Sequence, residues 1–362
     1  MWKNESAFGA KMNIKKIELH HFRNYEHLQL NLNKGINIFY GNNAQGKTNI
    51  LEAIFLCSIG RSFRTNKEKE LIQFGSDFAS VSVDFEKKDR EGNVKYTINP
   101  KKSFFVNGVK VKRLSDLIGT INTVIFTPDD INTLKDGPAV RRKFLDIYIS
   151  QLRPAYLYNL NLYLKTIEQR NNYLRLPDRK EEMLEIWDEK LAEYAEKVFL
   201  YRREYIEKIK PKLQGIHEKI TEGKEKISIN YHSDFQDRNQ FQTCLKDHRK
   251  IDFIKGFTTK GVHRDDFDVL INENPVHIYG SQGQHRTAML SLKMAELGVI
   301  YDEIGEYPIL LLDDFMSELD YKRRKNFLDH IGEAQVIITG TEKMELKNLD
   351  CSLFQVKKGE IE

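Results

Sequence analysis

The chain has 362 residues, of which 40% are apolar and 30% are charged, and its formal net charge at pH 7 is +4. This composition is sufficient for one large or two ordinary domains with a sizeable core. No uninterrupted apolar run reaches the length of a membrane span, so we expect no membrane association. Cys57, Cys244 and Cys351 form no CxxC pair, which fits a reducing cytoplasm and argues against a zinc site or a disulfide framework.

The sequence pattern of the first third of the chain predicts several strands and one helix. Residues 1–11 lack the apolar stretch of a secretory signal, and we expect them to be an extension outside the fold. Strand patterns cover residues 13–22 and 36–40, and a glycine-rich loop and a helix follow. Short strand signals then continue to residue 126, with Asn107-Gly108 as a hairpin turn.

The middle of the chain has a helical pattern. Apolar residues recur every three or four positions from Leu145 to Ile167, and again from Met183 to Ile209. This spacing predicts two amphipathic helices, joined by a turn at residues 175–180. At about 1.5 Å per residue each helix would be roughly 50 Å long. The two helices would therefore form a short pair and not a long coiled-coil arm.

Strands and helices alternate again toward the end of the chain. We expect strands at 226–231, 267–271, 275–279, 308–314, 334–340 and 353–356, and helices at 239–254, 282–304 and 321–331. Alternation at both ends of the sequence predicts an α/β fold in which the first and last segments share one sheet. We place this head at residues 12–125 and 261–362, with a mainly helical lobe inserted at 126–260.

A phosphate-binding loop follows the strand at 36–40. Its pattern is G-x-x-x-x-G-K-[ST], between a strand and a helix. The glycines let successive N–H groups turn toward a phosphate, the lysine can reach the β and γ oxygens, and the threonine offers its hydroxyl to Mg²⁺. The residues are Gly41, Asn42, Asn43, Ala44, Gln45, Gly46, Lys47 and Thr48.

Two carboxylates end the buried strand near residue 312. Asp313 is placed to hold Mg²⁺ opposite Thr48. Asp314, one residue further on, is suited to orient or deprotonate an attacking water. In isolation an ordinary acidic turn explains the pair equally well, but the phosphate loop favours the catalytic interpretation.

A second glycine-rich stretch, GSQGQHRT at 280–287, opens the helix predicted at 282–304. Ser281 is a natural N-cap, and Gly283 allows another backbone to approach closely. Simple helix capping explains these residues by themselves. However, the free N–H groups of the helix end also form an anion site, and one nucleotide does not need two such loops. Two copies packed head to tail would use both.

The order of these motifs resembles ABC-type ATPase heads, which are P-loop NTPases of the SMC/Rad50 class. The resemblance to the RecF family of bacterial recombination mediators is closer, and it covers nearly the whole chain from Met12. It rests on the three motifs above and on the blocks HFRNY (21–25), GRSFRTNKEKELIQFG (60–75), FTPDDINTLKDGPAVRRKFLD (126–146) and GVHRDDFDVLIN (261–272).

The resemblance implies roles for further residues. Arg23 and Asn24 would contact the nucleotide, and Ser317 to Asp320 would form the loop that communicates between two sites. The signature loop that acts across the dimer would comprise Ser281, Gln282, Gly283 and Gln284.

The resemblance also implies a function. The chain would bind ATP and Mg²⁺, form an ATP-dependent homodimer on DNA near single-strand gaps, and hydrolyse ATP slowly to release it. RecR and RecO would be its partners in loading RecA.

The sequence departs from the usual ABC pattern in four places. Tyr279-Gly280 stand where Leu-Ser is usual, and Asp314 stands where Glu is usual. No histidine follows the strand at 334–340, so Thr339 or Thr341 occupies the switch region. The Q-loop glutamine has no clear counterpart, and Pro128-Asp129 lie near its expected place.

Basic clusters suggest where DNA would bind. Residues 138–180 contain nine Lys or Arg and three Asp or Glu, and basic residues between aromatic ones suit phosphate contact. A solvated face explains any one of these charges equally well. The individual candidates are Arg61, Arg64, Lys110 and Lys112.

Three other functions are compatible with an ATP-binding head. A transporter ATPase subunit is disfavoured by GSQGQ and the missing histidine. A nuclease of the OLD type would need a further acidic metal-binding domain. A scaffold with structural ATP would show no turnover with DNA.

Overall fold

The computed structural model describes residues 12–88, 90–314, 327, 334–343 and 351–361. The chain divides into two compact units. The first comprises Met1–Asp130 with Lys293–Glu362, and the second comprises Ile131–Leu292. The sequence placed these boundaries near residues 125 and 260.

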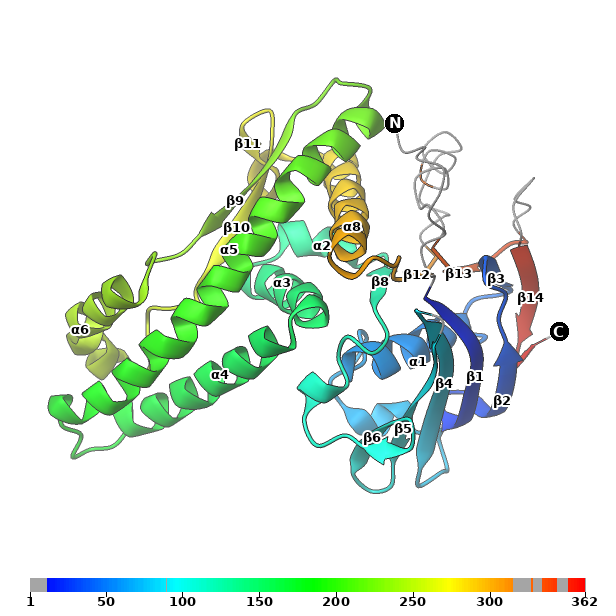
Figure 1. Cartoon of the computed structure of the whole chain (residues 1–362), viewed down its shortest axis with the longest axis horizontal. Coiled ribbons are helices and arrows are strands. Elements are labelled where there is room, and N and C mark those ends of the chain that lie inside the picture. The colour runs from blue at the N-terminus through cyan, green and yellow to red at the C-terminus, as the bar shows by residue number, and fades with distance from the viewer. Residues whose placement is uncertain (1–11, 89, 315–326, 328–333, 344–350, 362) are drawn as a thin grey trace. The chain divides into compact units, whose positions relative to one another are not determined.

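One sheet of the first unit is antiparallel and comes entirely from the first third of the chain (Figure 1). Buried and partly exposed residues alternate along its strands, as in β4, because one face covers the core. In sheet order the strands are β2 (Tyr25–Asn31), β1 (Asn13–Phe22), β4 (Ala79–Lys87), β5 (Arg90–Ile98), β6 (Lys102–Val106) and β7 (Val109–Lys110).

The other sheet of the first unit joins the two ends of the sequence. Its order is β15-β14-β3-β13-β12-β8, and the strands from β14 to β8 are parallel. Strand β12 reads as an unbroken apolar run because it is fully buried. The bounds are β15 (Glu360–Ile361), β14 (Cys351–Lys357), β3 (Ile36–Tyr40), β13 (Val336–Gly340), β12 (Ile309–Leu312) and β8 (Thr123–Phe126).

Helix α1 (Lys47–Ile59) connects the core of the two sheets. It contacts β4 and β5 of the antiparallel sheet and β8 and β13 of the parallel one. Nearly all of its residues are therefore buried, from Ile50 to Ile59. This burial fixes the start of the helix at the carboxyl edge of the parallel sheet, where α/β proteins place their ligands.

The second unit is mainly helical, as expected. Its strands β11 (Asn274–Pro275), β10 (Asp266–Ile271) and β9 (Ile227–His232) form a small antiparallel sheet. Because β10 pairs with β9, this unit extends to Leu292, beyond the boundary near residue 260 that the sequence suggested. Its helices are α3 (Pro138–Leu152), α4 (Pro154–Leu174), α5 (Glu185–Thr221), α6 (Arg238–Lys255) and α7 (Val276–Tyr279), and α2 (Asp130–Lys135) and α8 (Gln282–Ile304) cross the unit boundaries.

Two predictions about these elements are wrong. The helix expected to run through Leu145 and Ile167 is two helices, α3 and α4, because Pro154 has no N–H to continue the first and starts the second. The strand expected at 275–279 ends at Pro275, and the following four residues form α7.

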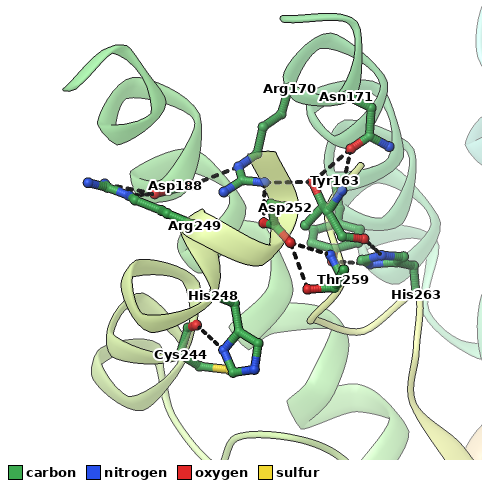
Figure 2. A network of polar contacts seen from close by, with 11 residues as sticks. Tyr163, Arg170, Asn171, Asp188, Cys244, His248, Arg249, Asp252, Thr259 and His263 are labelled. Carbon is green, nitrogen blue, oxygen red and sulfur yellow. Dashed lines mark hydrogen bonds and ion pairs between the residues drawn. The ribbon is translucent and has the colours of Figure 1, made fainter. Parts of the chain in front are cut away.

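A buried ion-pair network joins helices α4, α5 and α6 of the second unit (Figure 2). The Arg170 side chain is fully buried, and it donates to Asp188 (2.8 Å) and Asp252 (2.7 Å). Arg249 also binds Asp188, and the Thr259 N–H donates to Asp252 (2.9 Å). The network satisfies charges that burial would otherwise make costly.

Candidate functional site

The loop from Gly41 to Thr48 connects β3 to α1, as predicted. Three of its residues have positive φ angles, which are 146° at Gly41, 63° at Ala44 and 115° at Gly46. Glycine adopts such angles without steric cost. The loop conformation therefore explains why the motif requires glycine at its first and sixth positions.

Lys47 lies inside the loop. Its Nζ donates to the carbonyls of Gly41 (2.6 Å) and Asn42 (2.7 Å), and only 7% of the residue is exposed. Burial lowers the pKa of Lys47, while the charges of Asp314 and Asp313 act in the opposite direction. The ammonium group thus points back along the loop toward the place where phosphates bind in such motifs.

Asp313 meets Thr48 at the end of β12. The Thr48 Oγ1 donates to Asp313 Oδ1 over 2.7 Å, although 265 positions separate the two residues in sequence. Burial raises the pKa of Asp313, and the hydroxyl groups of Thr48 and Thr339 and the charge of Arg64 partly counteract it. The predicted pairing of phosphate loop and carboxylate is present in the structure.

Thr339, at the end of β13, completes this group. Its hydroxyl donates to Asp313 Oδ1 (2.8 Å) and accepts from the Asp314 N–H (3.0 Å). Asp314 has a φ of 48°, a left-handed conformation that is uncommon for a residue other than glycine and typical of functional sites. Of the two threonines proposed for the switch region, Thr339 is the one that touches both carboxylate residues.

Asn24 supports the outer side of the loop. Its Nδ2 donates to Gln45 O (2.9 Å), and its Oδ1 accepts from Asn49 (2.7 Å). A Cβ on Gly46 would lie 2.6 Å from Asn24 Nδ2, so the side chain closes against the loop backbone. Tyr25, which the sequence did not single out, donates to Gly46 O (3.1 Å).

Arg23, for which the resemblance implies a nucleotide contact, binds a buried carboxylate. Its guanidinium donates to both oxygens of the fully buried Glu52 (2.8 and 2.6 Å) and to Glu70 O (2.7 Å). Ser62 also donates to Glu52. The structure gives Arg23 a role in fixing α1, and the contact with the loop comes from Asn24.

Arg64, a DNA-binding candidate from the sequence, lies beside the phosphate loop. It donates to Asn49 Oδ1 (2.7 Å), lies 3.5 Å from Glu52 Oε2, and lowers the pKa of Asp313. Its side chain remains 43% exposed. Because Arg64 acts on Asp313, its charge can also influence an anion bound in the phosphate loop. The sequence could not indicate this position, because residues 60–67 form no helix or strand.

The loop at 281–284 forms a capping box at the start of α8. Ser281 Oγ accepts from the Gln284 N–H (3.2 Å), and Gln284 Oε1 accepts from the Ser281 N–H (2.9 Å). Ser281, Gln282 and Gly283 are exposed. The loop belongs to the second unit, whereas the phosphate loop belongs to the first.

The structure reduces the basic surface that was expected at 138–180. Arg141 pairs with Asp266 (2.7 Å) and Arg170 with two aspartates, and both side chains are buried. Lys110 and Lys112 remain exposed on and after the hairpin strand β7, and Arg61 is partly exposed. Ser317 and Asp320 lie outside the described residues.

Two further observations concern the described residues alone. They contain no cluster of three or more His, Cys, Asp or Glu side chains that could hold a metal ion. They also contain no helix whose length and apolar character would let it cross a membrane.

Comparison with known proteins identifies the fold. The family model of the RecF/RecN/SMC N-terminal domain matches residues 13–361. The Smc head domain of Pyrococcus furiosus is 18% identical, with a TM-score of 0.56 over 97% of this chain and 95% of that one. The architecture is that of an ABC-type ATPase head, as the sequence predicted.

More similar proteins narrow the family. DNA replication and repair protein RecF of Clostridium novyi (strain NT) is 46% identical, over 97% of this chain and 99% of its own. The corresponding protein of Clostridium tetani (strain Massachusetts / E88) is 42% identical over 96% and 99%. A solved structure of the recombination mediator protein RecF with ATP, of the RecFOR pathway, is 38% identical, with a TM-score of 0.92 over 99% of both chains. The chain therefore belongs to the RecF family.

Proposed function

We propose that the chain is an ATP-driven switch in DNA replication and recombinational repair. The observation that carries this proposal is the convergence of Thr48, Asp313 and Thr339 beside the loop that begins at Gly41. In this site Gly41 to Thr48 surround the phosphates of ATP, and Lys47 exchanges the carbonyls of its own loop for phosphate oxygens.

The oxygen atoms at the end of β12 suit Mg²⁺. Thr48 Oγ1 and Asp313 Oδ1 are 2.7 Å apart, and hard cations of this size prefer oxygen ligands, with few from the protein and the rest from water and phosphate. Thr48 and Asp313 would hold the ion. When bound, Mg²⁺ neutralises charge on the phosphate oxygens.

Asp314 acts on the attacking water. Its backbone N–H is bound to Thr339 Oγ1 (3.0 Å), which fixes the residue relative to Asp313. The carboxylate orients the water or takes its proton. Because the aspartate side chain is one methylene shorter than the usual glutamate, we expect slow hydrolysis.

A second copy of the chain completes the site. Ser281, Gln282 and Gly283 are exposed at the positive end of α8, where N–H groups favour an anion. Ile278 and Tyr279, next to the loop, are 61% and 70% exposed. In a head-to-tail dimer this loop caps the γ-phosphate held by the partner copy.

Membership of the RecF family supports the proposal that DNA and recombination proteins are the partners. The dimer binds duplex DNA near single-strand gaps, and it acts with RecR and RecO to load RecA. Arg61, Arg64, Lys110 and Lys112 are candidates for phosphate contacts, and Arg64 also lies beside the nucleotide loop. Hydrolysis then releases the clamp.

Sedimentation of the full chain with and without ATP tests the dimer. Wild type should shift from the 42.5 kDa monomer to a dimer. Lys47→Arg should lose nucleotide-dependent dimerisation, because the arginine fork does not fit the site of the lysine. Ser281→Arg should still bind ATP and remain a monomer. Normal ATP-dependent dimerisation of Ser281→Arg would refute the role of this loop across the dimer.

A further inference from the structure

The capping box at Ser281 depends on the orientation of one amide. Gln284 Oε1 must face the Ser281 N–H, from which it accepts at 2.9 Å. The other end of the same amide, Nε2, donates to Glu225 Oε1, also at 2.9 Å. If the amide rotated by a half-turn, its oxygen would face the carboxylate and its NH₂ would face the Ser281 N–H, so both contacts would become repulsive. Glu225 therefore selects the orientation that closes the box.

The backbone next to Glu225 is held in place by Asn272. It lies in the short connection between α5 and β9. The next residue, Lys226, donates its N–H to Asn272 Oδ1 (2.9 Å), and Lys226 O accepts from the Asn272 N–H (2.8 Å). The Glu225 side chain is 24% exposed. The carboxylate that binds Gln284 therefore extends from a backbone that is hydrogen-bonded at the next residue, and it is only partly exposed to solvent.

The buried His217 leaves the carboxylate available to Gln284. Its Nε2 is 3.5 Å from Glu225 Oε2, and its Nδ1 is 3.0 Å from Ser291 Oγ. Ser291 donates its own hydroxyl hydrogen to Thr287 O (2.8 Å), so Nδ1 is the nitrogen that carries a hydrogen. Burial lowers the pKa of His217, against the opposing effect of Glu225. The ring faces Oε2, whereas Gln284 binds Oε1, so the two contacts use different oxygens of the carboxylate.

We propose that Glu225 is a positioning residue for the signature loop: it orients Gln284, which shapes the loop at Ser281 to receive the phosphate held by a partner copy. The purpose of this positioning rests on the function proposed above. The contacts themselves lie within one compact unit of one chain. A loop that is shaped before association loses less conformational entropy on binding.

Hydrogen exchange of the nucleotide-free chain tests the positioning directly. The Ser281 N–H is bonded to the Gln284 side chain, so its protection reports on the orientation of the amide. Loss of a hydrogen bond to a charged acceptor should speed exchange in Glu225→Ala by about tenfold or more. Glu225→Gln retains an oxygen that can accept from Gln284 Nε2 and should keep most of the protection. Glu218→Ala, an exposed change in the last turns of α5, is the matched control.

Dimerisation with ATP tests the consequence. Glu225→Ala should bind ATP as a monomer with wild-type affinity, and its dimer should be about tenfold weaker. Because Glu225 acts through Gln284, the double variant Glu225→Ala/Gln284→Ala should dimerise no more weakly than Gln284→Ala alone. A merely structural role would make the two losses add.

The outcomes separate the two proposals. Unchanged Ser281 exchange in Glu225→Ala, or additive losses in the double variant, would overturn the positioning role even if Ser281→Arg blocks dimerisation. If Ser281→Arg dimerises normally, the role of the loop across the dimer fails. Faster exchange in Glu225→Ala, with rescue by Glu225→Gln, would still support the orientation of Gln284 by Glu225.

Discussion

Replacing Thr339 with valine removes one hydroxyl from the centre of the nucleotide site and nearly preserves the shape of the side chain. Thr339 is 1% exposed, and its hydroxyl donates to Asp313 and accepts from the Asp314 N–H. A hydrogen bond to a charged acceptor contributes about 1.5–3 kcal/mol, and an N–H left without an acceptor costs about 1–3 kcal/mol. Burial of the added methyl returns about 0.8 kcal/mol.

We therefore expect Thr339→Val to lower the free energy of unfolding by about 2–5 kcal/mol and to lower the melting temperature by several degrees. ATP turnover with DNA should fall by at least about tenfold, because Asp314 loses the contact that fixes its backbone. Thermal melts and steady-state ATPase assays measure the two effects. Thr339→Ser is the matched control, since it keeps the hydroxyl and loses only a methyl group. Wild-type melting and turnover in the valine variant, or equal losses in the serine variant, would refute this reasoning.

Two further predictions concern buried charge. Burial raises the pKa of Asp313, so the charged carboxylate costs stability above that pKa, and the cost disappears below the pKa of the unfolded chain. Asp313→Asn should therefore melt at or above the wild-type temperature at pH 7, and this advantage should shrink as the pH falls toward about 4. A higher melting temperature for wild type at pH 7 would contradict the prediction. Arg170→Met leaves Asp252 buried without its cation, so it should lower the free energy of unfolding, measured with denaturant, by about 3–5 kcal/mol. Arg249→Met changes a partly exposed partner of Asp188 and should lower it by less. Equal losses in the two variants would show that the depth of burial does not decide the cost.

The nucleotide loop and the carboxylate strand could be predicted from sequence because their signals are local. A glycine pattern between a strand and a helix, and an apolar run ending in Asp313, each specify their own geometry. Their meeting follows from a parallel sheet, whose strands present their carboxyl ends at one edge. The same rule places Thr339 there, because β13 pairs with β12 in register, with Leu312 opposite Ile338.

Other contacts have no local signal. Arg64 and Glu225 reach their partners from irregular segments, and nothing in their neighbouring residues shows which way these segments turn. Net charge also overstated the exposed basic surface at 138–180, because Arg141 and Arg170 are buried in ion pairs. Position in the fold, and not residue type, decides whether a cation faces solvent or a carboxylate.

The phosphate loop is hydrogen-bonded to the turn between β14 and β15, at Lys358 and Gly359. Gln45 Oε1 accepts from the Lys358 N–H (2.6 Å), and Gln45 O accepts from the Gly359 N–H (3.2 Å). A substitution in this turn would therefore loosen the phosphate loop without touching any motif. The ATP affinity of such a variant must be measured before a loss of dimerisation is assigned to the dimer interface.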